Sequence, residues 1–264
     1  MKQEEDNQIV YGPVASWRLG RSLGVDLICG EKSCSFNCKY CQLGGEGNLT
    51  VDRQEFLETD EVLAAVEEAL NSGIEVDVIT LSGSGEPTLA TNLGEVIKGI
   101  KEMSELPVAV LTNGSLMTEP EVREELLGAD IVKAKLDAAT EEIFQELNQP
   151  HADLELEALV HALSKFARRE EVFFALEIML TPVNMEQTRR LAELAETISP
   201  DEVQINTPYR ESSVKPLTDT ELELATIPFA EKKLAYRVVN REERPEISDI
   251  LSQAKMQKLK REGG

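Results

Sequence analysis

Short apolar runs alternate with longer amphipathic stretches over most of this chain. Runs rich in Val, Ile and Leu predict strands at residues 24–28, 76–81, 108–112, 131–136, 172–180 and 202–205. Apolar residues at helical spacing predict helices at residues 59–70, 93–103, 119–127, 141–147, 154–167 and 185–198. Strand and helix thus alternate in a regular order, which is typical of a parallel sheet covered by helices.

Six strand-then-helix units predict an α/β fold: a partial (β/α)6 TIM-type barrel with parallel strands and a short C-terminal appendage. In such barrels the chemistry takes place at the carboxyl ends of the strands. After about residue 208 the pattern changes to a short helix, a short strand and a final polar helix, at residues 219–225, 236–239 and 247–261. The expected division is an N-terminal arm, a core domain and an appendage, at residues 1–22, 23–210 and 211–264.

The charge balance is strongly acidic, with 49 acidic against 27 basic residues and a net charge of −22. This balance weighs against extended binding along RNA or DNA. A local basic patch can exist on an acidic protein, so nucleic-acid binding stays open. No apolar run approaches the roughly 20 residues of a membrane helix, and the polar N-terminus lacks the apolar core of a signal peptide. We therefore expect a cytoplasmic protein with no membrane partner.

Three of the four cysteines, Cys34, Cys38 and Cys41, crowd together with the spacing C-x3-C-x2-C. Such clustering in a cytosolic protein indicates metal or redox chemistry rather than disulfide bonds. A cubane cluster held by three thiolates keeps one iron open to bind another molecule. Zinc sites usually take four ligands, and here a second cysteine pair is missing. A zinc-binding protein and a non-catalytic iron–sulfur electron-transfer protein remain as alternatives.

The cysteine spacing, with the aromatic Tyr40 before the third cysteine, resembles the signature of the radical S-adenosylmethionine (radical SAM) superfamily. The resemblance implies a [4Fe–4S] cluster on Cys34, Cys38 and Cys41 whose open iron chelates S-adenosylmethionine, with Tyr40 near the adenine. It implies reductive cleavage of S-adenosylmethionine to a 5′-deoxyadenosyl radical. It also implies an external electron donor of the ferredoxin or flavodoxin type, and leaves the substrate unknown.

Two further motifs follow predicted strands, where a barrel places its chemistry. Gly83, Ser84, Gly85 and Glu86 resemble the Gly-Gly-Glu motif of the family, which accepts hydrogen bonds from the ammonium group of the cofactor. The Thr-Asn-Gly sequence around Asn113 also recurs in the family at this point. An ordinary glycine-rich loop is the alternative for the first motif. The resemblance assigns all five residues to the cofactor site.

The fourth and sixth predicted strands end in polar residues. Alternation along a strand puts Lys133, Lys135 and Asp137 on one face. Basic side chains that point into a barrel are costly unless they are paired. Lys135 is our candidate for the cofactor carboxylate and Asp137 for the ribose or the substrate, with salt bridges to neighbouring strands as the alternative. Asn206 is a candidate cofactor contact, because this strand end supplies adenine contacts in the family.

The N-terminal segment from Tyr11 to Gly24 resembles the Gly-Pro-Val-Pro-Ser-Arg-Arg-Leu-Gly opening of one radical SAM subgroup. That subgroup is related to the wyosine-synthesising tRNA enzymes, and most of its members have no established substrate. This chain departs from the pattern with Ala15 for Pro and Trp17 for Arg. Arginine forks bind carboxylates and phosphates, so the candidate substrate contacts are Arg18, Arg21 and Arg210. A surface arm with no binding role is the alternative.

Overall fold

A single twisted sheet is the frame of the molecule. The computed structural model describes residues 8–16, 19–45, 47–210 and 212–239. The sheet has eight strands in the order β1-β2-β5-β6-β7-β8-β9-β10. Its strands are β1 (Val10–Ser16), β2 (Gly20–Val25), β5 (Val78–Leu81), β6 (Val108–Thr112), β7 (Ile131–Lys135), β8 (Phe173–Met179), β9 (Glu202–Asn206) and β10 (Tyr236–Val238).

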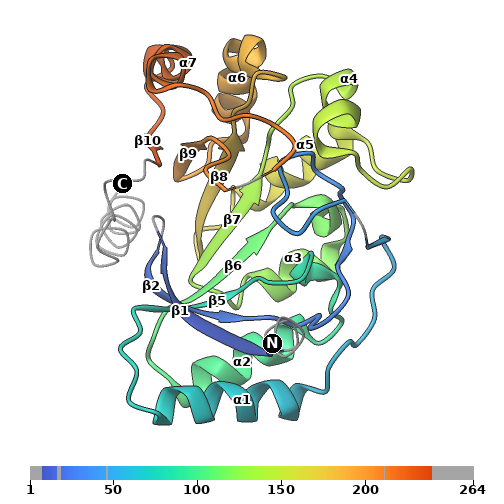
Figure 1. The fold of residues 1–264 in the computed structure, drawn as a ribbon, viewed down its shortest axis with the longest axis vertical. Coiled ribbons are helices and arrows are strands. Elements are labelled where there is room, and N and C mark those ends of the chain that lie inside the picture. Colours follow the sequence, from blue (N-terminus) through green and yellow to red (C-terminus); the bar gives the residue numbers. More distant parts are fainter. Residues whose placement is uncertain (1–7, 17–18, 46, 211, 240–264) are drawn as a thin grey trace.

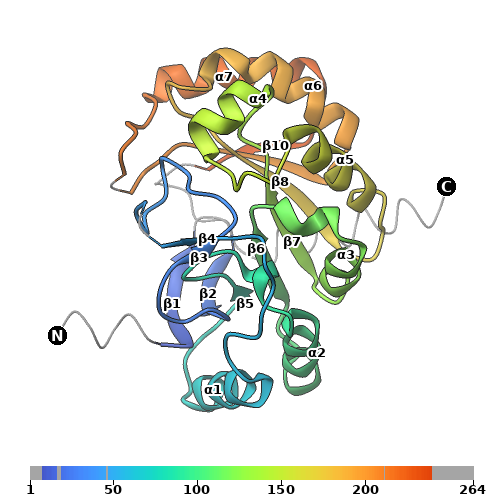
Figure 2. The same cartoon turned by 90° about the vertical axis from the view of Figure 1, so that its right-hand side faces the viewer.

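Helices connect the parallel strands and lie along the outer side of the sheet (Figures 1 and 2). They are α1 (Thr59–Asn71), α2 (Leu93–Met103), α3 (Pro120–Leu126), α4 (Glu141–Ile143), α5 (Leu156–Phe166), α6 (Thr188–Ile198) and α7 (Asp219–Glu231). Single turns are η1 (Pro87–Leu89), η2 (Ser115–Thr118) and η4 (Met185–Gln187), and the π-helix η3 (Phe144–Asn148) continues α4. In the described part of the chain, no helix is both long and apolar enough to span a membrane.

The strand order confirms the predicted partial (β/α)6 barrel. Strands β2 and β5 to β9 are parallel, β10 continues the parallel series, and β1 is antiparallel to β2. Among the described residues β1 and β10 do not pair, so the barrel stays open between these two edges (Figure 1). The predicted strand at 236–239 is present as β10, whereas the predicted helix at 247–261 lies outside the described residues.

The first predicted strand was placed too late in the chain, and β1 was not predicted. The first parallel strand, β2, ends at Val25, because the next side chain turns the backbone: Asp26 Oδ1 accepts hydrogen bonds from the amides of Ile28 (3.0 Å) and Cys29 (3.2 Å). The segment that forms β1 and β2 contains three glycines and one proline, residue types that are depleted in strands. Its pairing comes from tertiary packing rather than from local propensity.

The N-terminal hairpin is anchored inside the barrel by Tyr11. The ring of Tyr11 occupies the space where a side chain at position 24 would lie, which Gly24 leaves open. The Tyr11 hydroxyl forms a 2.8 Å hydrogen bond with Ser82, directly after β5. The hairpin is therefore fastened at the carboxyl ends of the strands.

The inner face of the barrel is apolar at one end and polar at the other. Leu19, Val78, Ala109, Ile131 and Phe173 form a small buried cluster near the amino ends of the strands. Residues further along the same face are polar and include Thr80, Lys133, Lys135, Glu177, Gln204 and Asn206. The main core lies instead between the sheet and the helices. Polar side chains on the inner face are thus concentrated toward the carboxyl ends of the strands.

The cysteine-bearing segment is docked onto the loop after β5 through its backbone. Ser33 opens the short strand β3 (Ser33–Cys34), which pairs with β4 (Asn48–Leu49). The Ser33 amide donates to the Ser84 carbonyl (3.1 Å), and the Ser33 carbonyl accepts from the Glu86 amide (3.0 Å). A Cβ atom at Gly85 would lie 1.7 Å from the Ser33 carbonyl oxygen, so only glycine permits this approach.

We predict that Gly85→Ala lowers the free energy of unfolding by about 2 kcal/mol, because the new methyl group forces the Ser33 backbone away. Urea unfolding followed by circular dichroism measures the effect. Gly45→Ala is the matched control, since a Cβ atom there would have only ordinary contacts with Asn37. Equal stability of the two variants would contradict the docking role of Gly85.

A second prediction concerns alkaline stability. Burial raises the pKa of the Tyr11 phenol above its usual value of 10, Asp26 adds to the rise, and the hydrogen bond with Ser82 opposes it. The folded protein thus holds this proton more tightly than the unfolded chain does. Its stabilising contribution is complete below about pH 10 and is lost as the pH rises through the folded-state pKa.

We therefore expect the stability difference between wild type and Tyr11→Phe to be constant below about pH 10 and to shrink above it. Urea unfolding at a series of pH values gives this difference directly. Tyr236→Phe, at an exposed position, is the control for the loss of a phenol hydroxyl elsewhere in the protein. A Tyr11→Phe difference that stays constant to the highest pH would be the contrary result.

Candidate metal centre

The three clustered cysteines lie on one loop that covers the carboxyl end of the barrel. Cys34 ends β3, and a 2.9 Å hydrogen bond from the Cys41 amide to the Cys38 carbonyl folds the loop between the other two. All three side chains are partly exposed and carry free thiols, as does the fourth cysteine, Cys29. In the residues that the structure describes, no three His, Cys, Asp or Glu side chains are close enough to hold a single metal ion.

Several N–H groups are directed at the cysteine sulfurs. The Phe36 amide donates to Cys34 Sγ (3.4 Å), and the side-chain amide of Asn113 reaches the same atom (3.6 Å). The side-chain amide of Asn148 donates to Cys38 Sγ (3.5 Å). Thiolates that bind an iron–sulfur cluster accept such hydrogen bonds, so this donor set fits a cluster.

The Cys34 and Cys38 thiols hold their protons tightly. Burial raises the pKa of the Cys34 thiol to about 12, and the nearby Glu86 adds to the rise. Burial likewise raises the pKa of Cys38 to about 11, with a further contribution from Asp137. Because thiolates are the metal-binding form, metal uptake here must release these protons.

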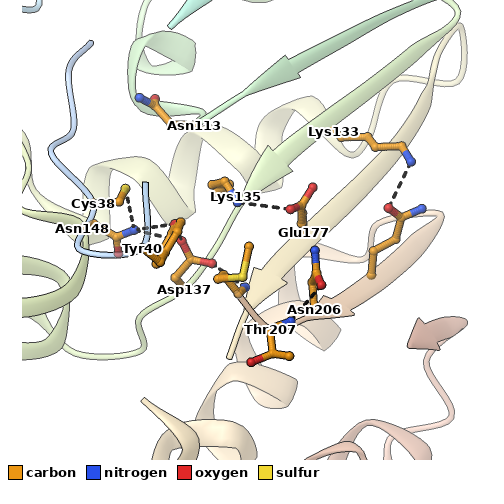
Figure 3. Close-up of polar contacts among 12 residues, drawn as sticks. Cys38, Tyr40, Asn113, Lys133, Lys135, Asp137, Asn148, Glu177, Asn206 and Thr207 are labelled. Carbon is orange, nitrogen blue, oxygen red and sulfur yellow. Dashed lines mark hydrogen bonds and ion pairs between the residues drawn. The ribbon is translucent and has the colours of Figure 1, made fainter. Parts of the chain in front are cut away.

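Tyr40 and Asp137 form a buried polar cluster beside Cys38 (Figure 3). The Tyr40 hydroxyl donates to Asp137 Oδ2, which also accepts from the Asn148 side chain (2.9 Å). Asp137 Oδ1 accepts from the Met179 amide (2.7 Å), which ties the end of β7 to the end of β8. Burial and the Asp137 carboxylate raise the pKa of the Tyr40 phenol well above its usual value.

Inward-facing lysines form polar contacts with side chains of other strands (Figure 3). Lys135 Nζ lies 3.2 Å from Glu177 Oε1 and 5.2 Å from the centre of the Tyr40 ring. Deeper in the barrel, the fully buried Lys133 donates to Gln204 (3.0 Å). Strand-to-strand pairing, one alternative in the sequence analysis, is thus present, and a role for Lys135 at a cofactor carboxylate stays a prediction.

The small residues after β5 make room for other parts of this chain. Asp26 occupies the space beside Gly83, and its Oδ2 accepts from the Ser84 amide (2.7 Å) and hydroxyl (2.5 Å). At Gly85 the Ser33 backbone makes the corresponding close approach. The motif therefore joins the end of β2 and the cysteine segment to the end of β5, and its contact with a cofactor stays a prediction.

Glu86 is buried and uses both carboxylate oxygens inside the protein. Oε1 accepts from Thr88 (amide 3.1 Å, hydroxyl 2.7 Å) and from the Thr112 hydroxyl (2.6 Å), and Oε2 accepts from the Asn113 amide (2.6 Å). Burial raises the pKa of this carboxyl group, and the four hydrogen bonds oppose the rise. Glu86 thereby fixes the turn after β6 that points Asn113 at Cys34.

The remaining predicted site residues lie in different places. Asn206 is buried at the end of β9, where its Oδ1 accepts from the Thr207 amide (2.8 Å). Arg210 donates to Gln42, next to Cys41, and so reaches the cysteine loop. Arg21 pairs with Asp77 (2.7 Å) at the amino ends of β2 and β5, the barrel end away from the cysteines. Arg18 lies outside the described residues.

A cavity of about 770 Å³ opens beside the cysteine loop. Cys38 and Cys41 line one side, and Ser212 to Val214, in the connection from β9 to α7, line another. The Ser213 hydroxyl donates to the Lys39 carbonyl (2.6 Å), which holds this connection against the loop. Cavities of this size accommodate cofactor-sized molecules.

Residues 32–195, more than half of the chain, match a protein-family model described as the radical SAM superfamily. The chain belongs to the radical SAM superfamily. The matched region contains all three clustered cysteines and the strand ends from β5 to β8. Membership confirms the family that the cysteine motif indicated.

Known proteins resemble this radical SAM chain in sequence and in fold. A UPF0026 protein of Synechocystis is 46% identical over 76% of the chain and 76% of its own length. The solved structure of Streptococcus suis SuiB bound to S-adenosylmethionine has a TM-score of 0.64 at 14% identity; the match covers 91% of this chain but only 53% of SuiB. A TYW1 structure with a lysine-pyruvate adduct has a TM-score of 0.61 at 18% identity, over 81% of this chain and 75% of that one. The two structures show that the fold is shared.

Sequence reasoning missed one residue at the centre of the polar cluster beside Cys38. Asn148 contacts Cys38, Tyr40 and Asp137, although it follows directly after the predicted helix at 141–147. The helix ends there in a π-turn, and Gln149 adopts a left-handed conformation with φ of 46°. The Asn-Gln-Pro sequence that terminates the helix was the available signal.

We predict that Asp137→Leu lowers the free energy of unfolding of the metal-free protein by about 3 kcal/mol, because three buried donors lose their acceptor. Asp137→Asn keeps an oxygen for the Met179 amide, so we expect a loss of only about 1 kcal/mol. Urea unfolding of the two variants compares these losses. Similar values for both would mean that the hydrogen bonds to Asp137 do not contribute as described.

Proposed function

We propose that this protein is a radical SAM enzyme that binds a [4Fe–4S] cluster through Cys34, Cys38 and Cys41. The observation that carries the proposal is the cysteine loop itself, with side-chain and backbone N–H groups directed at two of its sulfurs. Family membership supports the same chemistry. The loop covers the barrel end at which enzymes of this architecture act.

S-adenosylmethionine is the proposed cofactor, bound next to the cysteine loop. We assign Tyr40 to its adenine, Asp137 to its ribose and Lys135 to its carboxylate. These assignments are supported by the proximity of the three side chains, which contact one another beside Cys38. Further contacts are proposed from Asn206 and from the strand ends at Gly83, Ser84, Gly85, Glu86 and Asn113.

The cluster, when bound, supplies the electron that cleaves S-adenosylmethionine into methionine and a 5′-deoxyadenosyl radical. The protein itself binds and orients the cofactor and keeps water from the reacting atoms. Because the electron comes from outside, the enzyme requires a reductant, which we propose is a ferredoxin or flavodoxin. The substrate would enter at the barrel mouth, where Arg210 is a candidate contact.

The cellular setting follows from charge and composition. A cytoplasmic location is our proposal, since reduced thiols and a reductant are available there. The net charge of −22 argues against nucleic acid as the main partner. A substrate other than an extended nucleic acid is therefore the simplest proposal.

The test is the formation of 5′-deoxyadenosine by the purified protein. The protein is reconstituted anaerobically with iron and sulfide, reduced with dithionite, mixed with S-adenosylmethionine and analysed by chromatography. We expect 5′-deoxyadenosine from the wild type and a loss of at least about 100-fold in Cys38→Ala. Cys29→Ala is the matched control, because this cysteine lies outside the C-x3-C-x2-C motif and should leave the yield unchanged.

Other outcomes of this assay would point to other functions. A brown protein that makes no 5′-deoxyadenosine, with a cluster spectrum that S-adenosylmethionine does not change, would indicate electron transfer. A colourless protein that retains zinc would refute the proposal and favour a structural zinc site. Equal losses in Cys29→Ala and Cys38→Ala would show that the assay reports folding rather than cluster ligation.

A further inference from the structure

Two asparagine side chains from different parts of the fold approach two different cysteines. Asn113 follows β6 and donates to Cys34 Sγ (3.6 Å), and Asn148 ends η3 and donates to Cys38 Sγ (3.5 Å). Asn148 is 1% exposed and Asn113 7% exposed, so water does not compete for these contacts. Each of the two carboxamides thus donates an N–H group to one cysteine sulfur of the loop.

The orientation of Asn148 is fixed by its acceptor. Asp137 offers only carboxylate oxygens, so the amino group of Asn148 and not its carbonyl oxygen must face Asp137, 2.9 Å away. The same amino group serves Cys38, and Oδ1 is left buried without a hydrogen-bond partner among the described residues. A buried acceptor without a partner is costly. The hydrogen bonds that the amino group donates to Asp137 and Cys38 therefore maintain this orientation.

Asn113 is fixed from both ends of its carboxamide. Its Oδ1 accepts from the Ser115 amide (2.9 Å), which leaves the amino group to face Ser35 (2.8 Å) and Cys34. Its backbone amide is held by the Glu86 carboxylate (2.6 Å). Three independent contacts therefore aim this donor at the sulfur before any metal is bound.

We propose that Asn113 and Asn148 are positioning residues that raise the reduction potential of the cluster by donating N–H hydrogen bonds to Cys34 and Cys38. Reduction adds a negative charge to the cluster, and a donor at the sulfur stabilises that charge more than the oxidised state. In a buried site the effect is strong, because the surrounding dielectric is low. The proposal rests on the function proposed above, since it requires the cluster.

The experiment is an anaerobic redox titration of the reconstituted protein, followed by electron paramagnetic resonance and carried out without S-adenosylmethionine. We expect the midpoint potential of Asn148→Leu and of Asn113→Leu to shift to more negative values than in the wild type. Leucine has the same branched arrangement of side-chain heavy atoms as asparagine but no N–H group, so it removes the donor while the skeleton of the side chain is kept. The double variant should show approximately the sum of the two shifts.

The matched control is Asn37→Leu. Asn37 lies on the same loop, but its carboxamide contacts Lys32 (3.0 Å) and Gln149 (3.4 Å) rather than a sulfur. This variant disturbs the loop without removing an N–H donor to a cysteine, and it should keep the wild-type potential. Asn148→Ser provides a second test if leucine prevents folding, because serine stays polar but is too short to reach the sulfur.

The outcomes separate this inference from the proposed function. A wild-type protein that binds no iron or sulfide refutes the function itself. A wild type that binds the cluster, with unchanged potentials in the Asn113 and Asn148 variants, refutes only the role of the two asparagines. A shift of the same size in Asn37→Leu would also overturn the inference, since loop disturbance alone would then explain the change.

Discussion

The docking of the cysteine segment onto the loop after β5 is the contact on which the site depends. Backbone hydrogen bonds join Ser33 to Ser84 and Glu86, and Gly85 leaves room for the approach. Without this anchor the cysteine segment would be a mobile surface loop, and the positions of its thiols would not be fixed. The backbone pairing fixes Cys34, and Glu86 connects the same loop to the turn that carries Asn113.

The division of the barrel interior into an apolar end and a polar end gives the site its location. The apolar cluster around Val78, Ile131 and Phe173 fills the amino ends of the strands. Charged and amide side chains occupy the other end, where pairs such as Lys135 with Glu177 satisfy one another. A buried charge without a partner would be too costly, so the polar layer is a network rather than a set of isolated groups.

The parallel strands and the cysteine motif could be predicted from the sequence, whereas the N-terminal hairpin and the inner contacts could not. Strands such as β6 (Val108–Thr112) are buried on both faces and read as apolar runs. Strand β1 contains glycine and proline and exists because Tyr11 packs over Gly24, a contact between different strands that no local pattern reveals. Asn148 was missed because its importance comes from its contact with Cys38, far away in sequence, whereas the local Asn-Gln-Pro signal marks only the end of a helix.

The residues that hold the cysteine loop in place come later in the chain than the loop itself. During synthesis the loop leaves the ribosome early, but Gly85, Asn113 and Asn148 follow much later, and the connection that carries Ser213 comes later still. Contacts between such distant parts of a chain form late in folding. Iron and sulfide delivered to the nascent loop would meet three unsupported thiols. The cluster proposed for this loop is therefore expected to assemble on a chain that is already folded.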